Sequence, residues 1–182
     1  MRDEGREPRA LFEYSAPETQ PLGNVGDIHF AYSFAAQAVE VEVDMSTGEV
    51  RVLRVIAAND VGRALNPLGL RAQIEGGVMM GLGAALMEEF IVEKGRVVTD
   101  RLARYRIPSI AQMPEITSLI VEHPAREGPY GAKGVGEITS IPTAPAVANA
   151  VYNATGVRAR RIPIDQDWLA RELAGMRSRA NG

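Results

Sequence analysis

The sequence predicts an α+β fold with mixed strands, because its apolar residues change their period along the chain. Between residues 39 and 57 they recur at every second position, which is typical of half-buried strands. From about Pro67, and again from about Thr143 to Thr155, they recur with the helical period of about 3.6 residues. We therefore expect hairpins at about residues 39–57 and 90–99, packed on a long helix that contains several glycines.

The first hairpin follows an irregular segment, residues 1–35, which contains several prolines and glycines and no apolar period. In the first strand valines at positions 39, 41 and 43 alternate with acidic residues. Ser46-Thr47-Gly48 supplies a turn, and the second strand returns from Val50 to Ala57.

Asn66-Pro67 predicts the start of the long helix, because Asn can cap free amides and Pro at the first turn loses no hydrogen bond. The helix is expected to run to about Phe90. Each glycine inside a helix costs about 1 kcal/mol relative to alanine, so the four glycines here need a reason. They are Gly76, Gly77, Gly81 and Gly83.

Two interpretations of these glycines are open. Gln73, Gly77, Gly81 and Ala84 fall on one face of the predicted helix. The glycines allow tight packing on another backbone, or they form a flat surface from which Gln73 donates hydrogen bonds to a large bound group.

Further elements follow in order. Residues 90–92 and 97–99 form the second hairpin, and residues 116–122 form a further strand. The helix from Thr143 ends at Gly156. Asp167 is expected to cap a last amphipathic helix that ends at about Met176. The chain thus divides into the irregular segment 1–35, a domain over residues 36–176 and a frayed tail over residues 177–182.

Composition excludes several classes of function. The chain has 182 residues, 46% of them hydrophobic and 24% charged, with a net charge of −3, which argues against a nucleic-acid surface. It contains no cysteine, so disulfides, thiolate-bound zinc and iron–sulfur clusters are excluded. No stretch has the length of a transmembrane span or the apolar core of a signal peptide, so we expect a cytoplasmic protein.

The candidate catalytic residue is Glu137, which ends the heptad Gly-Ala-Lys-Gly-Val-Gly-Glu at residues 131–137. Three glycines allow another group to approach the backbone closely, and Lys133 is the only cation near the carboxylate in the sequence. A glycine loop that delivers one acid can hold a general base against a ligand. The alternative is a surface turn with a solvated glutamate. The heptad lacks the Gly-Lys-Ser/Thr ending of a phosphate-binding loop.

The order and spacing of several motifs over residues 30–165 resemble the C-terminal part of the molybdenum-cofactor subunit of the xanthine dehydrogenase/aldehyde oxidase family. The motifs are Asp60 to Pro67, Gln73 to Gly77, Gly81 to Glu89, Tyr105 to Pro108, the heptad, Ala148 to Ala150 and Ala154 to Gly156.

This resemblance implies a molybdenum hydroxylase that oxidises an N-heterocycle or an aldehyde with oxygen from water. It implies that Glu137 is the base toward a metal-bound hydroxide and that Gln73 binds molybdopterin, either alone or as its cytosine dinucleotide. It also implies that Gly134, Val135 and Gly136 press their backbone against the cofactor, and that no residue of this chain binds the metal directly.

The chain departs from the family in length, because the family's molybdenum subunit is several times longer. The upstream cofactor-binding loops and the substrate-selecting residues are absent, so the resemblance implies a partial molybdopterin-binding domain. It implies partner chains that carry the upstream part, iron–sulfur clusters and FAD. The alternative is a non-catalytic subunit or an inactive fragment that only assembles with a partner chain.

Overall fold

The computed structural model describes residues 9–180 and has the α+β fold that the sequence predicts. Its main sheet has three strands in the order β1 (Ala35–Val43), β2 (Val50–Asp60) and β5 (Glu115–Val121). β1 pairs with β2 in antiparallel orientation, whereas β5 pairs with β2 in parallel orientation. The parallel pair makes the sheet mixed, as expected, and the C-terminal ends of β2 and β5 lie side by side at the same end of the sheet.

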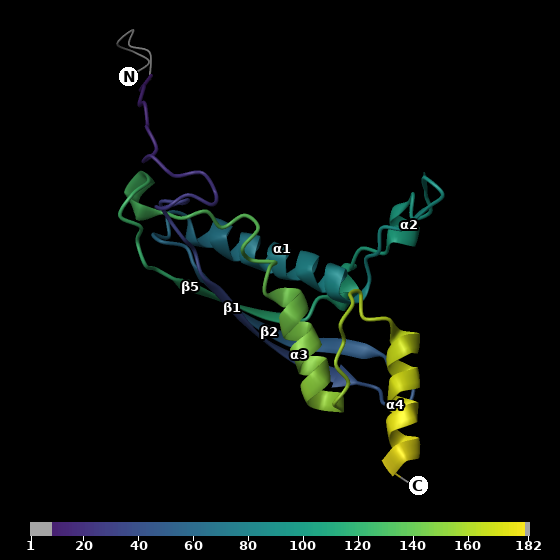
Figure 1. The fold of residues 1–182 in the computed structure, drawn as a ribbon. Coiled ribbons are helices and arrows are strands. Elements are labelled where there is room, and N and C mark those ends of the chain that lie inside the picture. Colours follow the sequence, from purple (N-terminus) through teal and green to yellow (C-terminus); the bar gives the residue numbers. More distant parts are fainter. Residues whose placement is uncertain (1–8, 181–182) are drawn as a thin grey trace, which may run out of the picture.

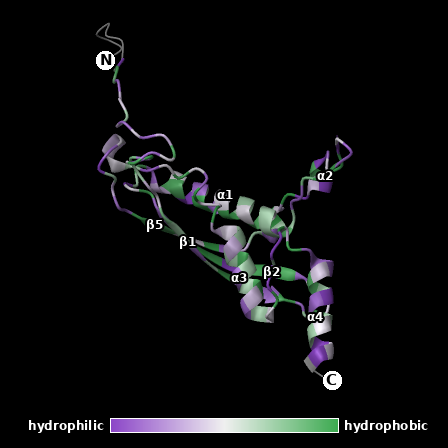
Figure 2. Ribbon diagram, in the orientation of Figure 1, coloured by the Kyte–Doolittle hydropathy of each residue, from purple (hydrophilic) through white to green (hydrophobic). Residues whose placement is uncertain are grey.

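Two helices pack on one face of this sheet: α1 (Pro67–Leu86) and α3 (Thr143–Thr155), which crosses the strands (Figure 1). Hydrophobic residues are concentrated along the strands of the main sheet and parts of α1 (Figure 2). The core lies between these layers. Its fully buried members include Val55, Ala57, Ile74, Val78, Val147 and Val151.

The β1–β2 hairpin is confirmed, with alternating half-buried and exposed residues along β1. Val39 and Val43 pack against the core, and the acidic residues Glu40 and Glu42 are exposed on the opposite, open face. On that face Arg54 pairs with Glu40 of the neighbouring strand at 3.1 Å.

α1 begins where Asn66-Pro67 predicted, and the Asn66 side chain accepts a hydrogen bond from the Gly69 amide at 3.0 Å. Three of its glycines, Gly77, Gly81 and Gly83, serve close packing, and a Cβ atom on Gly83 would lie 1.9 Å from Glu88 Oε1 and 2.9 Å from Pro108 Cδ. A Cβ atom on Gly77 would lie 1.8 Å from Thr139 Oγ1, and one on Gly81 would lie 2.4 Å from Thr143 Cβ. Gly76 differs, because a Cβ atom there would meet no atom within 4 Å.

The second predicted hairpin shrinks to two short strands, β3 (Val92–Glu93) and β4 (Arg96–Val97), whose residues are all exposed. It belongs to an arm that continues through α2 (Leu102–Tyr105) and a 3₁₀ turn at Ile110–Gln112, neither of which was predicted. The hairpin stays short because none of its strand residues is buried against the core, and an isolated two-stranded hairpin is marginal in water.

The last helix, α4 (Gln166–Ala180), corrects two predictions. Its cap is Asp165 rather than Asp167, because Asp165 Oδ1 accepts a hydrogen bond from the Trp168 amide at 2.6 Å. The helix also continues past Met176, where the sequence predicted its end: residues 177–180 of the predicted tail are helical, and the Arg177 guanidinium donates to the Met45 carbonyl. The rest of that predicted tail, residues 181–182, lies outside the described residues.

Residues 9–34 of the N-terminal segment contain no helix or strand, and residues 1–8 lie outside the described part of the chain. Within residues 9–180, β1 and β5 each pair on one side only, so both are edge strands. None of the helices in this range is long and apolar enough to cross a membrane.

Candidate functional site

The glycine heptad, residues 131–137, lies beside the N-terminal half of α1 and close to the N-terminal segment (Figure 1). Its first residue, Gly131, ends a short 3₁₀ turn at Pro129–Gly131, and the heptad precedes the loop that leads into α3. Three separate elements contact it: the end of β2, α1 and the segment that contains Ser33, whose Oγ lies 3.4 Å from the Gly134 carbonyl.

A buried ion pair holds the start of the heptad. Lys133 Nζ lies 2.6 Å from Asp60 Oδ2 at the end of β2, and the two side chains are only 5% and 8% exposed. Asp60 Oδ1 accepts a hydrogen bond from the Gly62 amide, and the Lys133 amide donates to the Val61 carbonyl. Burial alone would raise the pKa of Asp60, but the bonds from Lys133 and Gly62 outweigh burial and lower it.

Gly62 makes this contact possible. Its φ of +67° lies in the left-handed region, and a Cβ atom there would lie 2.2 Å from the Gly131 carbonyl oxygen. Only glycine combines that backbone conformation with so close an approach. The end of β2 and the start of the heptad therefore lie backbone against backbone.

Side-chain amides hold the other end of the heptad. Gln73 Nε2 of α1 donates to the Gly136 carbonyl at 3.0 Å, and Gln37 Nε2 of β1 donates to the Thr139 carbonyl at 2.8 Å. Thr139 is fully buried, and its side chain fills the space that Gly77 leaves open on α1.

Between these two anchors part of the heptad faces outward. Glu137 is exposed, and so are Gly134 and Gly136, at which an added Cβ atom would meet no atom within 4 Å. Val135 points inward and is 9% exposed. Lys133 is engaged by Asp60, so the cation nearest to Glu137 in the sequence does not neutralise its carboxylate.

All five residues predicted for the site, Gln73, Gly134, Val135, Gly136 and Glu137, thus lie on one loop or in contact with it. The donor of Gln73 faces the heptad in this structure; its amide retains a second N–H and a carbonyl oxygen. Sequence reasoning missed the anchoring roles of Asp60 and Gln37. The available signal for Asp60 was an acid that ends a buried strand, followed by a glycine.

A cavity of about 620 Å³ borders the start of the heptad. The N-terminal segment forms one wall, with Ile28, His29 and Phe30, and the heptad forms another, with Lys133 and Gly134. The cavity would admit a small molecule next to the heptad.

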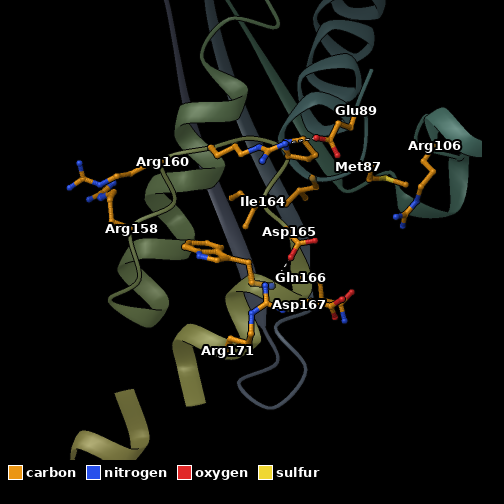
Figure 3. A pocket seen from close by; sticks show the side chains of 14 residues that line it. Met87, Glu89, Arg106, Arg158, Arg160, Ile164, Asp165, Gln166, Asp167 and Arg171 are labelled. Atoms are coloured by element: carbon orange, nitrogen blue, oxygen red, sulfur yellow. Dashed lines mark hydrogen bonds and ion pairs between the residues drawn. The ribbon is translucent and has the colours of Figure 1, made fainter. Parts of the chain in front are cut away.

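A second cavity, of about 760 Å³, lies at the opposite end of α1 and contains none of the predicted site residues (Figure 3). It is rich in arginine, but two of its cations have partners: Arg161 pairs with Glu89 at 2.6 Å, and Arg158 lies 3.7 Å from the Tyr152 ring centre. Arg158 points away from the cavity centre in Figure 3. We assign no function to this cavity.

Among residues 9–180, no group of three or more His, Cys, Asp or Glu side chains could hold a metal ion. What the heptad offers instead is exposed glycine backbone beside the amide of Gln73. Such a surface is suited to contact an organic group rather than a bare ion.

Residues 5–114 match the molybdopterin cofactor-binding domain family. The chain belongs to this family. The matched region includes β1, β2, and α1 with Gln73.

Relatives extend the similarity beyond this region. The chain is 42% identical over 163 residues to the aldehyde oxidoreductase molybdenum-binding subunit PaoC of Escherichia coli, a match that covers 87% of this chain. The residues outside this match are too few to reach the heptad from either end of the chain, so the match includes the heptad. It is also 36% identical over 148 residues to a xanthine dehydrogenase molybdenum-binding subunit of Escherichia coli, covering 79% of this chain.

The fold agrees with these matches. The solved structure of aldehyde oxidoreductase from Desulfovibrio gigas superposes with a TM-score of 0.73 at 34% identity, over 78% of this chain and 15% of that protein. This chain spans 22% of the length of PaoC and 20% of that of the xanthine dehydrogenase relative. It therefore corresponds to part of a molybdenum-binding subunit of the xanthine dehydrogenase/aldehyde oxidoreductase family.

Proposed function

We propose that this chain contributes one wall of the active site of a molybdenum hydroxylase, with Glu137 as the general base. The observation that carries the proposal is the exposed carboxylate of Glu137 at the end of a glycine loop that is anchored on both sides. A base needs a fixed position and an unneutralised charge, and the Asp60–Lys133 pair supports both conditions.

The residues present suit a molybdopterin, either alone or as its cytosine dinucleotide. Gly134 and Gly136 expose backbone with open space around it, so a large planar group can approach them. Gln73 lies beside this backbone and can offer its remaining N–H and its carbonyl oxygen to the cofactor.

When bound, the molybdenum cofactor supplies the two-electron oxidant and acidifies the oxygen nucleophile that comes from water. Glu137 would accept, at a carboxylate oxygen, the proton that this nucleophile gives up. The names of relatives, which include an aldehyde oxidoreductase and a xanthine dehydrogenase, favour an N-heterocycle or an aldehyde as the substrate.

Full activity is proposed to need partner chains. Large apolar side chains near the site are exposed, including Leu68 at 79% and Ile141 at 69%, which is typical of surfaces that pack against another polypeptide. We propose that the upstream part of a molybdenum-binding subunit covers this surface. Electrons would leave through iron–sulfur and FAD subunits, because this chain has no cysteine to hold a cluster.

Glu137→Gln in the assembled enzyme tests the proposal, because it keeps the size of the side chain and removes the base. We expect turnover to fall by at least ~10²-fold with cofactor content unchanged. Glu93→Gln, at an exposed carboxylate on β3, is the control and should leave turnover unchanged. Parent-like turnover by a fully loaded Glu137→Gln enzyme would instead favour a structural loop in a non-catalytic subunit.

A further inference from the structure

We propose that the buried Asp60–Lys133 ion pair is a latch that fixes the glycine heptad to the end of β2 and thereby positions Glu137. The inference rests on the proposed function for its catalytic consequence. The latch itself is a property of this chain and can be tested without a cofactor.

The geometry of the pair distinguishes it from the other ion pairs among the described residues. Lys133 and Asp60 are 5% and 8% exposed, whereas every other pair has at least one side chain more than half exposed. A buried pair is a weak way to gain stability, because the desolvation of both charges offsets their attraction. Its best supported use is to fix one arrangement of the chain over others.

The arrangement that needs fixing is the heptad. Glycines at 131, 134 and 136 give this backbone more accessible conformations than other residues would, so it needs external contacts to hold one conformation. Lys133 supplies two such contacts from one residue: its side chain reaches Asp60 and its amide reaches the Val61 carbonyl.

The latch and Gln73 hold different parts of the heptad. Lys133 lies four residues before Glu137, and Gly136, whose carbonyl accepts the Gln73 bond, lies one residue before it. Three anchors hold the loop: Asp60 of β2 before Glu137, Gln73 of α1 beside it, and Gln37 of β1, which donates to the Thr139 carbonyl after it. With the Asp60–Lys133 anchor released, the segment that leads into Glu137 can move about the other two.

Amide hydrogen exchange in the full 182-residue chain, followed by NMR, tests the latch. Asp60→Asn and Lys133→Gln each leave one charge buried without its partner, and the double variant that combines them removes both charges. Arg161→Gln is the matched control, because Arg161 also lies 2.6 Å from its partner, Glu89, but at the far end of α1 and with an exposed side chain.

The latch predicts that the amide at position 133, which is bonded to the Val61 carbonyl, exchanges at least tenfold faster in Asp60→Asn and in the double variant. Amides in the middle of α1, such as those of Val78 and Leu82, should change less than twofold. The double variant matters most, because it leaves no unpaired charge buried and still lacks the contact between the two charges.

The proposal is overturned if the amide at position 133 and the α1 amides change together in every variant, or if Arg161→Gln has the same effect. In the assembled enzyme the double variant should lower kcat at least tenfold, with KM and cofactor content within twofold of the parent values. If Glu137→Gln lowers turnover while the double variant keeps a parent-like kcat, the proposal is also overturned. The failure of the base assignment is distinct: Glu137→Gln would then turn over normally while the exchange result stood.

Discussion

Two adjacent glycines of α1 should respond to the same substitution with opposite sign. Gly76→Ala places a methyl group where no atom lies within 4 Å, so only the gain in helix propensity applies, about 1 kcal/mol. Gly77→Ala makes the same gain but places its Cβ atom 1.8 Å from Thr139 Oγ1 and 2.6 Å from Thr139 Cβ.

Thr139 cannot move aside easily, because it is fully buried and its carbonyl accepts a hydrogen bond from Gln37. Overpacking of this kind costs typically about 1–3 kcal/mol, and a contact this short belongs at the upper end. After the gain in propensity, Gly77→Ala should lower the free energy of unfolding by about 2 kcal/mol.

Thermal and urea unfolding of the 182-residue chain, followed by circular dichroism, measures both effects. A change of 1 kcal/mol shifts Tm by about 2–4 °C at this size. Gly76→Ala should therefore raise Tm by about 2–4 °C, and Gly77→Ala should lower it by about 4–8 °C. If Gly77→Ala equals or exceeds the parent in stability, the packing explanation of the helix glycines is refuted.

Three further predictions concern the cofactor, the ion pair and the last helix. Gln73→Ala should reduce the cofactor content of the assembled enzyme more than its turnover per bound metal; normal metal and pterin content would contradict a cofactor-binding role. The pKa of Asp60 is lower in the folded chain than its usual value of 3.8, so the charged carboxylate stabilises the fold at pH values above about 4. The free energy of unfolding should therefore fall as the pH drops below about 4, and Lys133→Met should weaken that pH dependence in urea titrations. Asp165→Ala should cost about 1 kcal/mol of unfolding free energy as the loss of a helix cap, and Asp167→Ala should cost less; equal losses would contradict the observed cap.

Local patterns predicted most of the secondary structure. The alternation of valine with acidic residues identified the β1–β2 hairpin, and Asn66-Pro67 identified the start of α1. The helix Thr143–Thr155 has its predicted bounds, closed by Gly156 in the left-handed conformation. These features depend on interactions between near neighbours in the chain, which a sequence displays directly.

Contacts between distant residues were not predictable in the same way. Asp60 and Lys133 are 73 positions apart, and their pairing follows from the parallel pairing of β2 with β5, which brings the loop after β5 to the end of β2. The five residues predicted for the site share one loop or contact it, and their roles in binding and catalysis stay predictions. The cap of α4 was misplaced because Asp165 and Asp167 both suit the start of a helix, and only the backbone geometry distinguishes them.

The two edge strands have a practical consequence for handling this chain. β1 and β5 present unpaired backbone amides and carbonyls along one side each, and β5 also exposes Leu119 and Val121, each 46% exposed. Such edges can recruit strands from other copies, so self-association through edge-to-edge pairing is the expected cause of precipitation at high concentration. Leu119→Lys would place a charge at an exposed position of the edge strand β5 and should improve solubility.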